Sequence, residues 1–190
     1  MRKDLGVLPA VFPMPVLMIG TYDENGKVNV MNLAWGNIST GEKIVLNMGS
    51  DRKTLANIRL RKAFSVALAD TDHIKQADYF GIVSGNKVAD KFERTGMHAV
   101  KGAYADAPVI QEFPLTMECE LLEERQVPEG SIVTGRILNV NADEKVLDEN
   151  GKVVAGKLNA VIFDQFGMSY YKAGEQFAKA WNAGVELAKE

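Results

Sequence analysis

The sequence predicts a mainly β protein, an antiparallel barrel of six or so strands with helical insertions. Three observations lead to this prediction. Strong turn signals separate short apolar runs, residues 115–121 alternate between apolar and polar side chains, and helical spacing is confined to two insertions and the C-terminus. Strands that follow one another through tight turns pair antiparallel, so a parallel α/β sheet is disfavoured.

Length and charge narrow the class of protein. The chain has 190 residues, which favours one domain over 1–190, and a domain of this size buries roughly 70% of the surface of its unfolded chain. The formal charge is −3 and the pI is near 5.5, with acids and bases interspersed. We therefore expect a small molecule or a protein as the partner, rather than nucleic acid or a membrane.

Cysteine usage and the N-terminal segment indicate a cytoplasmic protein. Cys119 is the one cysteine, which rules out an internal disulfide, and no CxxC or His-rich cluster offers a metal site. Residues 1–6 contain basic side chains but no sustained apolar run, and prolines interrupt the segment that follows. No run approaches the length of a membrane span, about 20 apolar residues.

The first hairpin is predicted from residues 15–22, the turn at 23–27 and the return arm 28–35. Both faces of the return arm mix polar and apolar side chains. One face carries Val28, Val30, Asn32 and Ala34, and the other carries Asn29, Met31, Leu33 and Trp35. Amide side chains on an otherwise apolar face suggest contact with something polar and flat, while the alternative is an edge strand with a solvated Asn.

The next stretch predicts a strand at residues 43–48, a turn at Gly49 and a helix capped by Ser50 or Asp51. The free N–H groups of such a helix start, beside Arg52, Lys53 and the Thr54 hydroxyl, suit a phosphate group. An ordinary capped surface helix fits the same spacing, and Asp51 disfavours an anion. Three further basic residues at the other end complement the helix dipole: Arg59, Arg61 and Lys62.

In the middle of the chain, predicted strands lie on either side of one helical insertion. Residues 63–68 alternate as a strand, and residues 70–72 cap a helix in which Ile74, Ala77 and Phe80 lie three apart. Residues 84–96 indicate a loop with one helical turn. The strand 113–122 is expected to turn four side chains inward (Leu115, Met117, Cys119, Leu121) and three outward (Thr116, Glu118, Glu120), with residues 132–140 as its partner.

The last part of the chain contains a short apolar run at 161–163, the pair Tyr170-Tyr171 and a predicted amphipathic helix over 174–189. This helix carries Phe177 and Trp181 on one stripe, as core or as a subunit contact. His73 and His98 have no nucleophile motif nearby and are expected on the surface. Because no acid–base machinery is visible, an enzymatic reaction would depend on a cofactor.

Read together, several motifs resemble the flavin reductase-like, FMN-binding split-barrel family, and within it the flavoredoxin group. The similarity extends from about Leu5 to the end of the chain. The motifs that carry it are Pro15-Val16-Leu17, Gly20-Thr21-Tyr22-Asp23, Asn29 to Asn32 with Ala34-Trp35-Gly36, Ser50 to Ile58, Ala77 to Gly85, Asp90-Lys91-Phe92 with Thr95-Gly96, Glu118-Cys119, and Tyr170-Tyr171 before the last helix.

The resemblance implies a six-stranded antiparallel, Greek-key-like split β-barrel with a C-terminal helix, usually a homodimer that holds one FMN non-covalently in each subunit near the interface. It places the phosphate at the start of the first helix and the ring along the strand 29–35. The cofactor-binding residues it implies are Asn29, Val30, Met31, Asn32, Trp35, Ser39, Ser50, Arg52, Lys53, Thr54 and Lys91.

The sequence departs from the family pattern at two places. Family members often carry Thr in place of Asn32 and Cys near Ser39, so hydrogen bonding to the ring differs here. Many flavin reductases also have a His after a Gly, linked to nicotinamide binding, where this chain reads Gly130-Ser131-Ile132. This departure disfavours direct use of NADH or NADPH.

Two functions follow from the resemblance. The first is an FMN-dependent oxidoreductase of the flavin reductase type, with a nicotinamide donor. The alternative is a non-enzymatic, flavoredoxin-like electron carrier between an iron–sulfur protein and another acceptor, which the missing His favours. A pyridoxamine-phosphate-oxidase-like or haem-binding split barrel is a third reading, but it would require His ligands or an arginine cluster that the sequence lacks.

Overall fold

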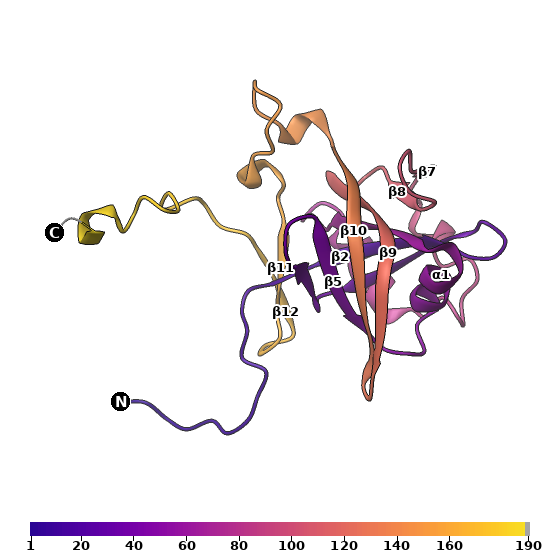
Figure 1. The fold of residues 1–190 in the computed structure, drawn as a ribbon, viewed down its shortest axis with the longest axis horizontal. Coiled ribbons are helices and arrows are strands. Elements are labelled where there is room, and N and C mark those ends of the chain that lie inside the picture. The colour runs from indigo at the N-terminus through magenta and orange to yellow at the C-terminus, as the bar shows by residue number, and fades with distance from the viewer. Residues whose placement is uncertain (189–190) are drawn as a thin grey trace.

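Residues 1–188 are described by a computed structural model, and a seven-stranded antiparallel sheet forms its centre (Figure 1). The strand order is β3-β2-β6-β9-β10-β5-β4. The strands are β2 (Leu17–Tyr22), β3 (Val28–Leu33), β4 (Gly36–Ile38), β5 (Lys43–Met48), β6 (Ala63–Leu68), β9 (Leu115–Val127) and β10 (Gly130–Ala142). The predicted mainly β, antiparallel architecture is confirmed.

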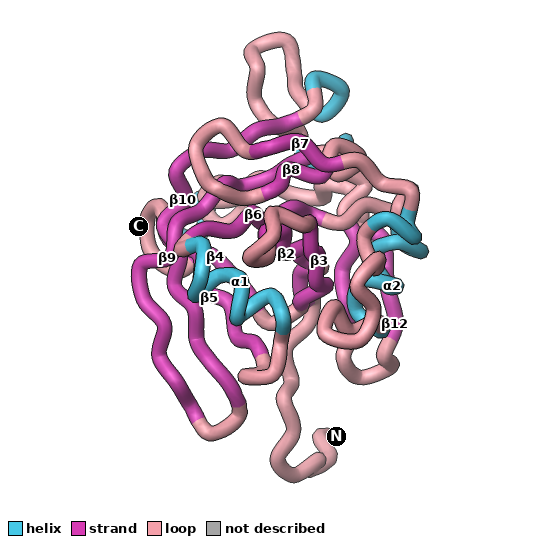
Figure 2. Tube along the Cα trace, turned by 90° about the vertical axis from the view of Figure 1, so that its right-hand side faces the viewer, coloured by secondary structure: helices cyan, strands magenta, loops and turns pink. Residues whose placement is uncertain are grey.

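The sheet curls because its two edge strands are neighbours in sequence. β3 ends at Leu33 and β4 begins at Gly36, so only Ala34 and Trp35 connect opposite edges of the sheet. A residue spans at most about 3.6 Å, so the sheet must bend until these edges lie close together. The tube in Figure 2 shows the resulting half-open barrel, with α1 and α2 beside it.

The central sheet has seven strands instead of the predicted six, because β4 was not predicted. Residues 36–41 were expected to form a loop, but Gly36, Asn37 and Ile38 pair with Leu46, Val45 and Ile44 of β5. Gly36 fits there because a Cβ at this position would lie 2.8 Å from the side chains of Leu17 and Leu46. The short strand is difficult to recognise in the sequence because its glycine and amide have low β propensity.

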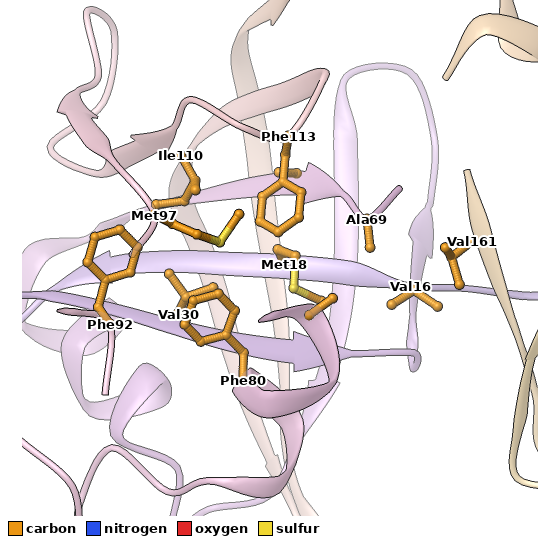
Figure 3. Close-up of a cluster of buried hydrophobic side chains, with 12 residues drawn as sticks. Val16, Met18, Val30, Ala69, Phe80, Phe92, Met97, Ile110, Phe113 and Val161 are labelled. Carbon is orange, nitrogen blue, oxygen red and sulfur yellow. The ribbon is translucent and has the colours of Figure 1, made fainter. Parts of the chain in front are cut away.

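β2 is buried on both faces and separates two hydrophobic cores. Val16, just before the strand, and Met18 belong to a core with Val30 and Phe80, drawn in Figure 3. The alternate positions Leu17 and Ile19 belong to a second core inside the curl. Successive side chains of a strand point to opposite faces, so a continuous apolar run is what a doubly covered strand requires.

Smaller elements cover the sheet. β1 (Met14–Pro15), β11 (Val161–Asp164) and β12 (Ser169–Lys172) form a second sheet, and β7 (Ala99–Lys101) pairs with β8 (Pro108–Ile110). The α-helices are α1 (Lys53–Arg61) and α2 (Ile74–Ile82), and the 3₁₀ helices are η1 (Glu93–Thr95), η2 (Glu144–Val146), η3 (Ala155–Lys157) and η4 (Val185–Ala188). Within residues 1–188, none of the helices is both long and apolar enough to cross a membrane.

The expected outward face of β9 is largely buried, which corrects the sequence-based assignment. Cys119 points inward as predicted, but Thr116 and Glu118 are only 1% and 2% exposed. The segment between β7 and β8 covers this face, and the Glu118 carboxylate accepts hydrogen bonds from the backbone N–H groups of Tyr104 (2.8 Å) and Ala105 (3.1 Å). The polar positions of this alternating strand therefore face a second buried layer, in which hydrogen bonds satisfy the Glu118 carboxylate.

The predicted C-terminal helix is wrong over the described part of its range, since residues 174–188 form only the 3₁₀ helix η4. Lys189, the last residue of the prediction, lies outside the described residues. Figure 1 shows this segment leaving the body of the protein, and Phe177 and Trp181 are 100% and 99% exposed. An amphipathic helix depends mainly on packing of its apolar face, and here the chain offers that face no surface.

The C-terminal end of α1 is fixed to the long hairpin β9–β10. Arg59 donates two hydrogen bonds to the Glu124 carboxylate, at 2.8 and 2.5 Å, and the Ser131 hydroxyl donates a third at 2.6 Å. The Arg59 and Ser131 hydrogen bonds lower the pKa of Glu124 to about 2. Ion pairing thus adds to the helix-dipole role expected for the basic residues here.

We predict that Glu124→Gln lowers the melting temperature at neutral pH, with an effect that disappears in acid. Because the folded-state pKa of Glu124 lies below its ordinary value of 4.5, the pair stabilises fully above about pH 4.5 and is lost as the pH falls towards 2. Thermal unfolding of both proteins from pH 7 to pH 2.5 measures this. A difference in melting temperature that does not shrink below pH 4 would contradict the assignment.

Candidate functional site

A pocket of about 290 Å³ lies where β3 and β5 meet α2 and the β11–β12 hairpin. Its volume is close to the lower end of the range for small-molecule sites, roughly 300–1,000 Å³. Most of its lining is apolar or backbone, with four polar side chains among it. The lining residues are Met31, Asn32, Leu33, Ala34, Trp35, Asn47, Met48, Gly49, Arg52, Gly81, Phe163 and Tyr170.

A narrower hollow continues from this pocket to the start of α1. The two share Met31, Arg52 and Gly81. The hollow is also lined by Asn29, Lys53, Thr54, Phe80, Val83, Ser84, Gly85 and Lys91. A mostly apolar pocket is therefore continuous with a polar, cationic hollow, a combination that suits an aromatic ring carrying an anionic group.

The start of α1 presents free donors to this hollow. The N-cap is Arg52 with an extended backbone and no side-chain cap, so the predicted cap by Ser50 or Asp51 is wrong. Gly49 and Arg52 instead close a turn, in which the Arg52 N–H donates to the Gly49 carbonyl at 3.3 Å. Among residues 1–188, the backbone N–H groups of Lys53 and Thr54 have no hydrogen-bond acceptor, so they can bind an anion.

Lys91 is a buried cation in the same hollow. Lys91 is 4% exposed, and its ammonium group donates a hydrogen bond to the Phe80 carbonyl at 2.8 Å. Burial, with a contribution from Arg52, lowers its pKa to about 8. An ammonium has three N–H donors, so Lys91 retains donors for a ligand. A buried cation beside another cation favours an anion or a carbonyl-rich ligand between them.

Lys53 and Thr54 also have partners within the protein. The Lys53 ammonium lies 3.2 Å from Asp23, and the Thr54 hydroxyl accepts from the Asn29 amide at 2.9 Å. Burial opposes ionisation of Asp23, but hydrogen bonds from Lys27, Lys53 and Asn25 outweigh it and hold its pKa below the ordinary value. The Lys53 charge is therefore partly neutralised before any ligand binds.

The remaining sequence-predicted site residues are spread over several environments. Met31 and Asn32 line the pocket, whereas Val30 is fully buried in the core, so any ligand contact at Val30 would involve its backbone. Trp35 is 53% exposed and lies at the pocket beside Phe163. Ser39 lines a neighbouring groove with Pro9, Pro13 and Pro15, outside the pocket lining. Exposed Ser50 lies outside the lining of both pocket and hollow. The cofactor-binding role of each of these residues therefore stays a prediction.

The structure adds pocket residues that the sequence did not identify, namely Asn47, Gly81, Phe163 and Tyr170. Tyr170 was not among the predicted cofactor-binding residues. Its hydroxyl donates to Asp78 at 2.9 Å, and burial together with Asp78 raises its pKa to about 12. A tyrosine beside an apolar run gives no signal for this contact, since Asp78 lies on α2, far away in sequence.

Metal and thiol chemistry find no support in the part of the chain that the structure describes. No cluster of three or more His, Cys, Asp or Glu side chains suited to a metal ion occurs within residues 1–188. Cys119 is buried in the core inside the curl, and burial raises the pKa of its thiol to about 12. The thiol therefore remains protonated at neutral pH and is a small hydrophobic side chain.

Comparison with known proteins identifies relatives over nearly the whole chain. The sequence model of a family described as "Flavin reductase like domain" matches residues 10–168. The flavoredoxin of Desulfovibrio vulgaris (Miyazaki F) is 33% identical, with a TM-score of 0.91 over 97% of this chain and 100% of that one. The flavoredoxin of Methanosarcina acetivorans is 26% identical, with a TM-score of 0.87 over 98% of both chains.

More distant structures share the fold. An FMN-binding protein from Thermus thermophilus has a TM-score of 0.76 at 22% identity, over 94% of this chain and 99% of that one. An uncharacterized protein from Aquifex aeolicus is 23% identical over 175 residues, which cover 87% of this chain and 86% of that protein.

We predict that Gly85→Ala deforms the hollow. A Cβ at Gly85 would lie 2.3 Å from the Asn29 amide oxygen, so the Asn29–Thr54 hydrogen bond must shift. Forced overpacking typically costs about 1–3 kcal/mol, to be measured by urea unfolding. Gly156→Ala is the matched control, since a Cβ there meets nothing within 4 Å and it should change stability by less than about 0.5 kcal/mol. Equal effects of the two substitutions would contradict the prediction.

Proposed function

Because the chain belongs to the flavin reductase-like family, we propose that it binds FMN non-covalently and works as a flavin-dependent oxidoreductase. The observation that carries the proposal is the continuity of the mostly apolar pocket with the cationic hollow at the start of α1. The related structures include flavoredoxins and an FMN-binding protein, which supports the same cofactor here.

The residues present fit FMN on chemical grounds. Met31, Trp35 and Phe163 offer apolar surface for a fused ring, and Asn32 offers an amide for its polar edge. Lys91 and Arg52, with the free N–H groups at the start of α1, offer donors for one phosphate. Because this hollow offers donors for one phosphate, it matches a mononucleotide, so we expect FMN to bind more tightly than FAD.

In this proposal the protein binds and orients while the cofactor carries the electrons. Bound FMN supplies hydride and electron transfer, chemistry for which the side chains of the pocket have no group of their own. Arg52 and Lys91 hold the anionic end, and the apolar lining restricts water at the ring. Tyr170 keeps its proton at neutral pH because its pKa is about 12, so it serves as a fixed hydrogen-bonding group.

The electron donor separates two candidate roles, a nicotinamide-linked reductase and a protein-fed electron carrier. Ser131 supports the carrier. It occupies the place where the family resemblance associates a His with nicotinamide binding, is 2% exposed, and donates its hydroxyl to Glu124 at 2.6 Å. The Ser131 hydroxyl is therefore already engaged and does not replace that His.

Anaerobic stopped-flow mixing of the FMN-loaded protein with NADH and with NADPH distinguishes the two roles. Rapid bleaching of the flavin absorbance by either nucleotide supports the reductase. Bleaching by a reduced iron–sulfur protein, with none by either nucleotide, supports the carrier.

We also propose a homodimer, supported by the exposed Phe177 and Trp181 and by the apolar character of the C-terminal segment. In a dimer the C-terminal segment would pack its apolar side chains against the partner subunit, and this packing would stabilise the segment as a helix. Sedimentation at micromolar concentration tests this, and a single species at the chain mass of 20.8 kDa would contradict it.

We predict that Arg52→Gln weakens FMN binding by about ten- to a hundredfold but leaves riboflavin binding nearly unchanged. The loss of a charge-assisted hydrogen bond costs roughly 1.5–3 kcal/mol, and riboflavin lacks the phosphate. Arg52 is chosen over Lys53 because its ion partner, Asp51, is an exposed neighbour at 3.7 Å, whereas Lys53 also neutralises buried Asp23. Parallel losses of FMN and riboflavin affinity would place the phosphate elsewhere.

We predict that FMN affinity falls as the pH rises through about 8 and that Lys91→Met removes this dependence. Lys91 is charged below its pKa of about 8 and neutral above it, so its attraction for an anion is lost with increasing pH. Fluorescence titrations at pH 6.5 and pH 9.5 provide the measurement. Lys87→Met is the control, an exposed lysine nearby on the chain, and it should retain the pH dependence of the wild type.

A further inference from the structure

The polar corner of the pocket contains a hydrogen-bonded chain that runs from Asn32 through Tyr170 to Asp78. The Asn32 amide nitrogen donates to the Ala77 carbonyl at 2.9 Å and to the Tyr170 hydroxyl at 3.5 Å. The Tyr170 hydroxyl in turn donates to Asp78 at 2.9 Å. These three contacts connect β3, β12 and α2 at one wall of the pocket.

This chain fixes which end of the Asn32 amide is available to a ligand. The Ala77 carbonyl can only accept, so the nitrogen rather than the oxygen of Asn32 must face it. Tyr170 gives its proton to Asp78 and therefore meets the second N–H of Asn32 as an acceptor. Both amide hydrogens are used by the protein, whereas the amide oxygen accepts no hydrogen bond from residues 1–188.

The corner is thus an acceptor surface, while Arg52, which lines the same pocket, offers hydrogen-bond donors. A ligand with a hydrogen-bond donor on its ring edge satisfies the Asn32 oxygen, and a ligand without one leaves it unpaired. Leaving a desolvated acceptor unpaired discriminates more strongly than losing apolar contact, because the group has also lost water.

We propose that Asn32 is the specificity-determining acceptor of the pocket, that Tyr170 and Asp78 are its positioning residues, and that the corner selects a planar heterocycle with an N–H donor on its edge. This inference rests on the proposed function: in FMN the donor is the imide N3–H of the pyrimidine ring. In this proposal the Tyr170–Asp78 hydrogen bond acts on the ligand through the orientation of the Asn32 amide.

The test compares FMN with N3-methyl-FMN, which lacks the donor, by equilibrium titration. Wild-type protein should bind FMN about tenfold or more tightly than the methylated flavin. Asn32→Leu keeps a similar side-chain volume but removes the acceptor, so the two flavins should then bind within about twofold of each other. Asn47→Leu is the matched control, an amide lining the same pocket without a link to Asp78, and it should preserve the wild-type preference.

Two outcomes would overturn the inference while leaving the proposed function intact. One is equal binding of the two flavins by the wild type. The other is a preference that survives in Asn32→Leu, or disappears in Asn47→Leu, because the cause would then be steric or belong to Asn47. Failure of the wild type to bind FMN at all would instead overturn the proposed function, and this inference with it.

A spectroscopic measurement keeps the inference testable if Asn32→Leu does not fold. With FMN labelled with ¹⁵N at N3, the wild-type complex should show an N3–H resonance protected from solvent exchange. Tyr170→Phe retains the ring and the Ala77 contact but releases one amide hydrogen of Asn32, so exchange of the N3 proton should become faster. A rapidly exchanging N3 proton in the wild type, or the same exchange rate in Tyr170→Phe, would overturn the assignment.

Discussion

Ala34 and Trp35 impose the constraint on which the rest of the structure depends, because they alone connect the two opposite edges of the central sheet. The chain between β3 and β4 is too short to cross a flat sheet of seven strands, so the sheet has to curl. The curl encloses one core, and the outer side of β2 supports the other. Trp35 also lies at the pocket, so the link that closes the fold is part of the candidate site.

The same closure explains why a mostly apolar pocket meets a cationic hollow. β3 and β5, which flank the short connection through β4, both contribute to the pocket, and α1 follows β5 after the turn at Gly49. The free end of α1 therefore lies beside the return strand of the first hairpin, where Asn29 reaches Thr54. Lys91 and Gly81, from the α2 region, complete the wall. The site combines segments that the topology, rather than sequence proximity, brings together.

Much of the fold could be predicted from the sequence, because local sequence signals determine most of its hairpins and helices. The Asn25-Gly26 turn, the alternation of residues 115–121 and the spacing of Ile74, Ala77 and Phe80 specified hairpins and α2 correctly. The strand–turn–helix corner at residues 43–58 was found for the same reason.

The predictions that failed depend on non-local contacts. They concern the burial of Glu118 under the β7–β8 segment, the pairing of β4, and the expected helix after β12, whose apolar stripe meets no partner surface in one chain. Tyr170 was missed because its partner, Asp78, comes from a distant element.

A crystal structure of the FMN complex tests the central claim most directly, namely that the pocket and the hollow hold one ligand between them. The account predicts that the isoalloxazine ring lies against Met31 and Trp35 and that the phosphate accepts hydrogen bonds from the Lys53 and Thr54 backbone N–H groups and from Arg52. A phosphate exposed to solvent away from α1, or a ring bound in the groove beside Ser39, would contradict it.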